Sequence, residues 1–268
     1  MFELTRSQKE IQKAAREFAK GEFDKELTLE LEEKGEFPEK IWKKAADLGF
    51  IGIQYDEAYE GGGLGILDAC LIAEEFCRKD STMGMALTLA GLGAEAVLRF
   101  GENSLKEKFL PGIVRGEMLS GIAFSESNFG LDLSSIETVA AFEDDKLIIN
   151  GKKTNVLNGE AAGFYLLLCK TGSEENPLKN LTLVIVEADR DGITINNPGE
   201  KLGINMTKTA AVTFTDVQVP TSNIVGKEGR AGKHLKAFFN EIKILTAAQT
   251  LGTAQGAMDR AIAYSKQR

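Results

Sequence analysis

The chain has 268 residues, of which 43% are hydrophobic and 27% charged, a composition typical of one or two globular domains. The net charge is −8, which argues against a nucleic-acid-binding protein, because such proteins concentrate Lys and Arg on one face. No run approaches the roughly 18 apolar residues that a membrane-spanning helix needs. The three cysteines, Cys70, Cys77 and Cys169, form no Cys-x-x-Cys pair. We therefore expect no metal site and a reducing, cytoplasmic location.

Residues 1–114 are predicted to form an all-α N-terminal domain, because apolar residues recur there at helical spacing. A capping residue, Thr5 or Ser7, precedes the first helical pattern. We expect the last helix of this domain to end near Pro111 and Gly112, since proline interrupts helical hydrogen bonding.

Residues 115–228 are predicted to form a middle β domain, an antiparallel sandwich or barrel. Seven short runs rich in Ile, Val, Leu, Phe and Thr are separated by turn residues such as Asp144-Asp145 and Asn150-Gly151. No helical pattern lies between the runs, so nothing indicates the parallel sheet of an α/β protein.

Helical spacing returns after the β domain, and residues 229–268 are predicted to form the first helices of a C-terminal α domain. Leu235, Phe238 and Leu245 lie on one apolar stripe. The chain stops inside this pattern without a capping residue, so we expect the C-terminal domain to be incomplete. The expected fold class is α+β multidomain: an N-terminal helical bundle, a middle antiparallel β-sandwich or barrel, and a truncated C-terminal helical domain.

Two glycine-rich segments fail as nucleotide-binding motifs. Residues 91–96 have the form Gly-x-Gly-x-x-Ala but follow no predicted strand. Residues 226–234 lack the first glycine of a P-loop, and His234 stands where a Ser or Thr is required. Because His234 is the only histidine, mechanisms that need two histidines are excluded.

Five longer segments resemble, in chain order, the motifs of the acyl-CoA dehydrogenase family. They are DEAYEGGGLG (56–65), AFSESNFGLD (123–132), INGKKTNVLNG (149–159), EKLGINMTKTAAVTFTDVQVPTSNIVG (200–226) and LGTAQGAMDRAIAYSKQR (251–268). Each match alone is weak, but together they cover nearly the whole chain in the family's order, which makes the resemblance specific.

The resemblance implies an FAD-dependent oxidoreductase of fatty acid metabolism that introduces an α,β double bond into an acyl-CoA thioester. In this family a glutamate removes the α-proton, and the flavin accepts the β-hydrogen as a hydride. Hydrogen bonds to the thioester oxygen stabilise the enolate. The implied electron acceptor is an electron-transfer flavoprotein, and the implied assembly is a homo-oligomer, a dimer or a tetramer.

Carried over position by position, the resemblance implies three groups of site residues. The residues implied to hold the flavin are Phe124, Ser125, Gly130, Leu131, Asn155, Val156 and Leu157. Arg268 matches an arginine that reaches the flavin pyrophosphate, usually across a subunit interface. The residues implied to contact CoA are Phe239, Asn240 and Lys243.

Four positions near the implied flavin depart from the family pattern. Asn155 stands where the family has a tryptophan that packs on the flavin. Leu157 and Leu131 replace hydroxyl side chains, and Ser127 replaces a proline. Loss of the aromatic wall or of a buried hydroxyl costs on the order of 1–3 kcal/mol of binding each. Backbone N–H donors remain, because they do not depend on side chains.

The catalytic base has no clear counterpart. In most family members it lies beyond the part of the family matched by this chain, and a minority place it at the position of Ile242. Glu241 is a weak candidate, because it lies one residue away, about 100° around a helix. Two functions therefore stay open: an FAD-dependent acyl-CoA dehydrogenase, or a diverged, non-catalytic structural subunit with weakened or lost FAD binding.

Overall fold

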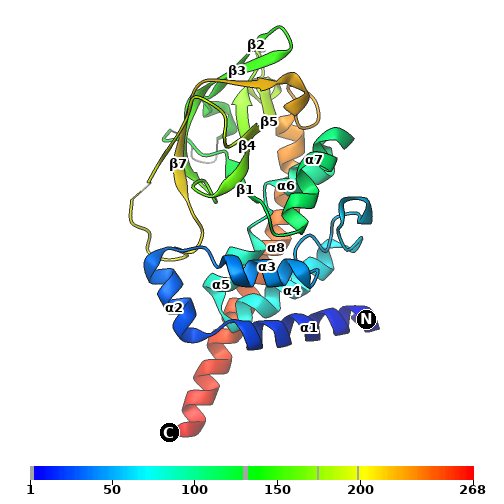
Figure 1. The fold of residues 1–268 in the computed structure, drawn as a ribbon, viewed down its shortest axis with the longest axis vertical. Coiled ribbons are helices and arrows are strands. Elements are labelled where there is room, and N and C mark those ends of the chain that lie inside the picture. The colour runs from blue at the N-terminus through cyan, green and yellow to red at the C-terminus, as the bar shows by residue number, and fades with distance from the viewer. Residues whose placement is uncertain (1–2, 129–131, 174, 198) are drawn as a thin grey trace.

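A computed structural model describes residues 3–128, 132–173, 175–197 and 199–268 of the chain. The helices that come first are α1 (Arg6–Glu22), α2 (Lys25–Lys34), α3 (Glu39–Asp47), α4 (Ile66–Lys79), α5 (Ser81–Thr88), α6 (Ala94–Phe100) and α7 (Asn103–Val114). The strands that follow are β1 (Leu119–Ala123), β2 (Val139–Glu143), β3 (Lys146–Val156), β4 (Ala162–Lys170), β5 (Leu181–Glu187), β6 (Ile193–Asn196) and β7 (Ala210–Pro220). The last helix is α8 (Ala231–Gln267). The predicted order of helical, β and helical regions is confirmed (Figure 1).

Local chemistry explains how the first helices begin and end. Thr5 caps α1 as predicted: its hydroxyl accepts from the Gln8 N–H at 3.2 Å, and the Gln8 side chain accepts from the Thr5 N–H at 3.0 Å. Helix α7 runs through Pro111 and ends at Val114, close to the predicted end near Pro111 and Gly112. The hydrogen bond that Pro111 cannot donate would have gone to the carbonyl of Glu107, an exposed residue that water can solvate.

The seven strands form one curled sheet in the order β1-β4-β2-β3-β7-β6, with β5 also paired to β4 (Figure 1). Pairing is antiparallel except where β4 meets β1 and β2. Strand β4 is buried on both faces. Phe164, Leu166 and Leu168 join the core shared with the helices, whereas Tyr165 and Leu167 join the core inside the curled sheet. This two-residue alternation attaches the helical layer to the sheet.

The predicted turn at Asn150-Gly151 is wrong, because β3 continues through both residues to Val156. The register between β3 and β7 shifts at Ile149/Gly151 and again at Lys153/Val156, so the glycine marks an irregularity within a strand. The turn at Asp144-Asp145 is confirmed, with Asp144 in a left-handed conformation at φ 53° between β2 and β3.

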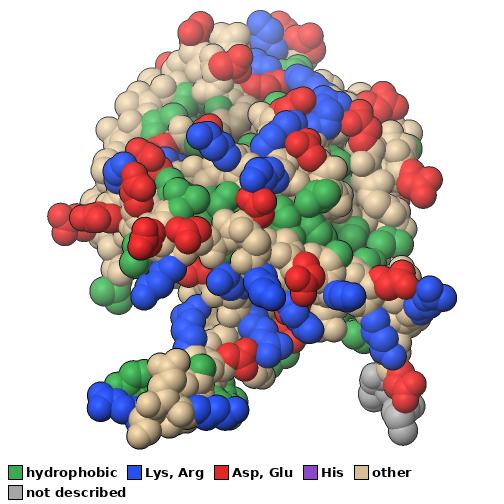
Figure 2. Space-filling model, turned by 60° about the horizontal axis from the view of Figure 1, so that its bottom comes forward, with side chains coloured by type: hydrophobic (Ala, Val, Ile, Leu, Met, Phe, Trp, Pro, Cys, Tyr) green, Lys and Arg blue, Asp and Glu red, His purple; other side chains and the backbone are tan. Residues whose placement is uncertain are grey.

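Helix α8 runs from beside β5 past α4 to the C-terminal end of the chain (Figure 1). Glycines bring α8 very close to α4: a Cβ on Gly252 would lie 2.2 Å from the Glu74 carbonyl oxygen, and one on Gly256 would lie 2.1 Å from that of Arg78. Beyond this crossing, Figure 2 shows hydrophobic side chains beside Lys and Arg on the protruding end of α8. Among them, Met258 is 59% exposed.

The predicted α+β fold class is confirmed: the curled sheet lies at the top of the view in Figure 1, and most of the helices lie below it. Within the described parts of the chain, no helix is both long and apolar enough to cross a membrane.

Candidate functional site

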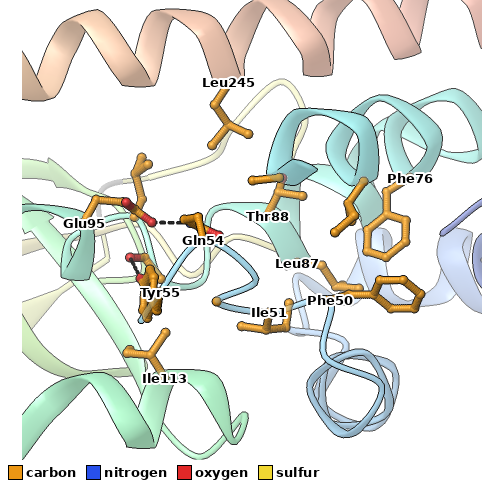
Figure 3. Close-up of a pocket in the computed structure, with 15 residues that line it drawn as sticks. Phe50, Ile51, Gln54, Tyr55, Phe76, Leu87, Thr88, Glu95, Ile113 and Leu245 are labelled. Carbon is orange, nitrogen blue, oxygen red and sulfur yellow. Dashed lines mark hydrogen bonds between the residues drawn. The ribbon is translucent and has the colours of Figure 1, made fainter. Parts of the chain in front are cut away.

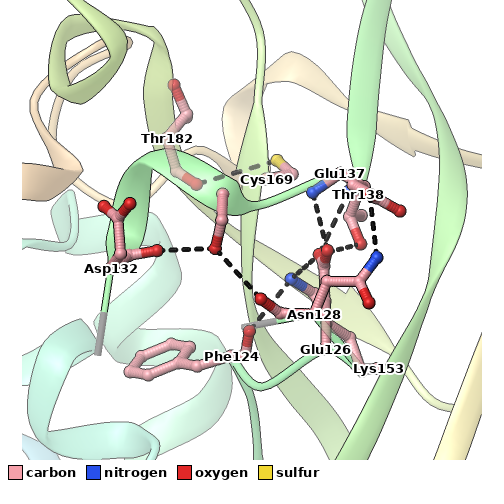
Figure 4. A network of polar contacts seen from close by, with 10 residues as sticks. Phe124, Glu126, Asn128, Asp132, Glu137, Thr138, Lys153, Cys169 and Thr182 are labelled. Carbon is pink, nitrogen blue, oxygen red and sulfur yellow. Dashed lines mark hydrogen bonds and ion pairs between the residues drawn. The ribbon is translucent and has the colours of Figure 1, made fainter. Parts of the chain in front are cut away.

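A buried polar network lies at the carboxyl end of β1 (Figure 4). Lys153, from β3, reaches across and donates from Nζ to Glu126 Oε1 at 2.6 Å and to the Phe124 carbonyl at 3.2 Å. Glu126 also accepts from the backbone N–H groups of Glu137 and Thr138, at 2.6 and 3.0 Å, and from the Thr138 hydroxyl at 2.6 Å. The network therefore ties the segment after β1 to β2 and β3.

The network holds Glu126 in its ionised form. Burial raises the pKa of this carboxyl, but the hydrogen bonds from Lys153, Thr138 and the Glu137 backbone outweigh burial and leave the pKa below its usual value. Gly151 makes room for this arrangement, because a Cβ there would lie 2.4 Å from the Thr138 hydroxyl oxygen.

Four of the predicted flavin residues lie together beside this network. Phe124 and Val156 are buried, whereas Ser125 and Leu157 are partly exposed. Backbone bonds join the two segments: the Thr154 N–H donates to the Ser125 carbonyl at 2.7 Å, and the Ile122 N–H donates to the Leu157 carbonyl at 3.4 Å. The structure thus brings the end of β1 against the end of β3.

Asn155 lies in the same segment, is exposed and adopts a left-handed backbone with φ 50°. Among non-glycine residues, asparagine tolerates this conformation well, so the residue suits the irregular end of β3. Gly130 and Leu131, which were also predicted to hold the flavin, lie outside the described residues.

Helix α8 supplies the other side of the site. The rings of Phe238 and Phe239 pack edge-on against Phe124, with centroids 6.1 and 6.2 Å away. Asn240 and Lys243, predicted to contact CoA, are exposed on the same part of the helix. The three predicted CoA residues therefore lie on the part of α8 that packs against Phe124.

Glu241, the weak candidate for the base, is ion-paired. Its Oε2 lies 2.7 Å from Arg99 Nε, and its side chain is 29% exposed. This ion pair directs the carboxylate toward α6.

Arg268 lies at the far end of α8, where its guanidinium donates to the Tyr264 hydroxyl at 2.8 and 3.0 Å. It follows Phe239 by 29 residues, which is about 43 Å along a helix. The structure does not bring Arg268 to the other flavin residues of the same chain.

Comparison with known proteins agrees with this geometry. Residues 5–117 match the family model for the acyl-CoA dehydrogenase N-terminal domain, and residues 121–217 match that for the acyl-CoA dehydrogenase middle domain. A short-chain-specific acyl-CoA dehydrogenase of Clostridium acetobutylicum is 32% identical over 268 residues, which cover 100% of this chain and 70% of that one. The chain belongs to the acyl-CoA dehydrogenase family.

Solved structures place this family member among proteins of the same fold. Butyryl-CoA dehydrogenase from Megasphaera elsdenii matches with a TM-score of 0.92 and 32% identity, covering 100% of this chain and 71% of that chain. A chain from a structure of the electron transferring flavoprotein of Acidaminococcus fermentans matches with a TM-score of 0.93 and 31% identity, covering 100% of this chain and 70% of that chain.

A further relative is known by sequence. An acryloyl-CoA reductase (NADH) of Anaerotignum propionicum is 30% identical, and the match covers 100% of this chain and 68% of that protein.

The proteins of this family are FAD-dependent dehydrogenases, and the donor set at the end of β1 fits a flavin. The fixed backbone after β1, the Ser125 hydroxyl and the Phe124 wall are the groups that can contact it. Asn155 offers a polar amide where an aromatic ring was expected, so the wall is apolar on one side only.

The sequence analysis missed a second polar group, which lines a cavity of about 50 Å³ between α5, α6 and α8 (Figure 3). Glu95 accepts a short hydrogen bond from the Gln54 amide, and the buried Tyr55 hydroxyl donates to the Gly91 carbonyl at 3.3 Å. The one available signal was a lone carboxylate within the apolar run of residues 94–98.

Proposed function

We propose that this acyl-CoA dehydrogenase family member binds FAD at the ends of β1 and β3 and an acyl-CoA thioester between the flavin and α8. The observation that carries the proposal is the Lys153–Glu126 network, which holds the backbone of Phe124 through its carbonyl, while the Phe124 ring packs against the rings of Phe238 and Phe239. It supports a rigid, partly apolar wall of the kind that a flat cofactor needs.

Different residues of the chain would bind the flavin and the CoA thioester. Ser125 and the backbone after β1 would hold the flavin, while Phe124 and Phe239 would exclude water from its reacting side. Asn240 and Lys243 would contact the CoA portion, and the Lys243 charge would attract its phosphates. FAD, when bound, supplies the acceptor for the hydride that leaves the β-carbon.

The proton acceptor is not assigned to Glu241. Arg99 holds this carboxylate in an ion pair, with Arg99 Nε 2.7 Å from Glu241 Oε2, so the carboxylate is already engaged by α6. The proposed function therefore concerns binding and orientation of the flavin and thioester by the described residues.

The test is reconstitution of the purified chain with FAD, followed by gel filtration and an absorbance spectrum. Retained absorbance at about 450 nm supports the proposal. Ser125→Ala and Phe124→Ala should weaken flavin retention, whereas Lys152→Ala, at an exposed neighbouring position on β3, should not. A chain that stays colourless with excess FAD would overturn it.

One observation favours a second function. Asn155 is exposed and Glu241 is paired with Arg99, so neither an aromatic flavin wall nor a free base is present at these two positions. This supports a non-catalytic structural subunit. A colourless chain that also binds no acyl-CoA would favour this function.

Partners and compartment follow from the same proposal. A chain from a structure of an electron transferring flavoprotein is similar to this one, which supports an electron-transfer flavoprotein as acceptor.

Arg268 can contact a flavin only in another copy of the chain if the helix stays intact, which supports a homo-oligomer. The three cysteines are free and buried, which supports a reducing compartment such as the cytoplasm.

A further inference from the structure

The cavity beside Glu95 has an apolar wall and one incompletely bonded carboxylate. Its wall includes Phe76, Leu87, Ile113 and Leu245, which Figure 3 shows around the polar group. Glu95 Oε1 accepts from Gln54, but Oε2 is buried and has no hydrogen-bond partner among the described residues. A buried acceptor without a partner costs roughly 1–3 kcal/mol, so a ligand that donates to it gains binding energy.

The cavity lies in line with the proposed thioester site along α8. Phe239 packs against Phe124, Ile242 packs against the same core one turn later, and Leu245 projects into the cavity. From Phe239 to Leu245 the helix advances about 9 Å. Thr88 lines the cavity, and its hydroxyl accepts a hydrogen bond at 2.8 Å from the amide of Gln249, which lies further along α8.

The size of the cavity suits the end of an acyl chain. At about 50 Å³ it has room for more than one water-sized group but not for a whole thioester. The far end of an acyl chain bound at the proposed thioester site would reach this cavity. We propose that Glu95 Oε2 selects an acyl chain that carries a hydroxyl group at that end. The inference rests on the proposed function, because the acyl chain would enter the cavity from the flavin side.

The chemistry of Glu95 favours a hydroxyl over charged groups. Burial is the main cause that raises the pKa of Glu95 to about 7, with Gln54, Arg99 and Tyr55 opposing it and Glu241 adding to it. Both protonation states are therefore present near neutral pH, and a hydroxyl can bond to either one. A carboxylate would meet the ionised form with like charge, and an ammonium would lose its hydration against apolar walls.

The test measures binding of two thioesters to the FAD-loaded full chain by calorimetry: hexanoyl-CoA and its ω-hydroxy derivative. The wild-type chain should bind the hydroxy ester about tenfold more tightly. Glu95→Leu should abolish this preference, while Glu107→Leu, at an exposed position on α7, should keep it. Equal affinity for the two esters, as expected of a cavity that holds water only, would overturn the inference.

A second variant separates recognition from folding. Glu95→Gln keeps the shape and should bind the hydroxy ester with a preference that does not change with pH. In the wild type the preference should grow as pH rises through about 7, where Glu95 ionises; Arg99, Glu241 and Tyr55 are the groups that act on it. The same pH response in both proteins would contradict a role for Glu95. Binding of neither ester would overturn the proposed function, and this inference with it.

Discussion

Two buried carboxylates occupy the two regions of the molecule in opposite ways. In the β region, Glu126 accepts four hydrogen bonds, including one from the fully buried Lys153. In the helical region, Glu95 has one oxygen bonded to Gln54 and the other without a partner among the described residues. The first carboxylate completes the structure, whereas the second is available to a ligand.

The difference gives the two groups opposite pH dependences. The pKa of Glu126 lies below its usual value, so it contributes stability above the unfolded pKa, and that stability is lost as pH falls through the folded pKa. The pKa of Glu95 is raised to about 7 in the folded protein. Its contribution to stability is therefore full below the pKa of the unfolded state and is lost as pH rises toward 7.

The largest effect is expected from breaking the complete network. Lys153→Met leaves the Glu126 charge buried without its cation and should lower the free energy of unfolding by about 3–5 kcal/mol in urea denaturation. The double variant Lys153→Met with Glu126→Leu should recover much of this loss, because neither charge remains. A single variant as stable as the wild type would refute the account of this network.

The next largest effect is expected at Glu95, where the substitution should raise the free energy of unfolding. Glu95→Gln has no proton to lose, so at about pH 8 it should be more stable than the wild type by up to about 3 kcal/mol. The difference should shrink as pH falls from about 7 to the unfolded value of 4.5. Thermal unfolding across pH measures it, with Glu107→Gln as an exposed control. A pH-independent difference would show that ionisation of Glu95 is not its cause.

The helical region depends on close packing as much as on polar bonds. Gly252→Ala places a methyl group 2.2 Å from the Glu74 carbonyl oxygen and should destabilise the fold by about 2 kcal/mol. Gly21→Ala, in α1, meets nothing within 4 Å and should be neutral or slightly stabilising. Equal unfolding midpoints for the two variants would contradict the close crossing of α4 and α8.

The smallest effect comes from removing one bond of the Glu126 network. Thr138→Val removes the hydroxyl that donates to Oε1 at 2.6 Å, while Lys153 and two backbone donors remain. We expect a loss of about 1.5 kcal/mol in the free energy of unfolding. Thr138→Ser, which keeps the hydroxyl, is the matched control and should recover most of the stability.

The sequence predicted the strands well, because short runs rich in Ile, Val, Leu, Phe and Thr, separated by turn residues, are typical of buried strands. It failed at Asn150-Gly151, where a strand continues through residues that usually form a turn, and it placed the end of α7 slightly early, since the helix continues through Pro111 to Val114. The residues predicted to hold the flavin, at the ends of β1 and β3, were chosen through motif order, and their role stays a prediction. The sequence did not point to Glu95, because its surroundings depend on Gln54 and on other cavity residues that lie far from it in the sequence.

The bond from Lys153 to the Phe124 carbonyl has a further consequence for ligand affinity. The segment Phe124–Glu126 is ordered during folding, so a ligand that contacts it does not have to supply that conformational entropy on binding. This preorganisation couples affinity to the integrity of one buried ion pair. Conditions that loosen the pair should raise the dissociation constant for a ligand at β1 before the chain unfolds.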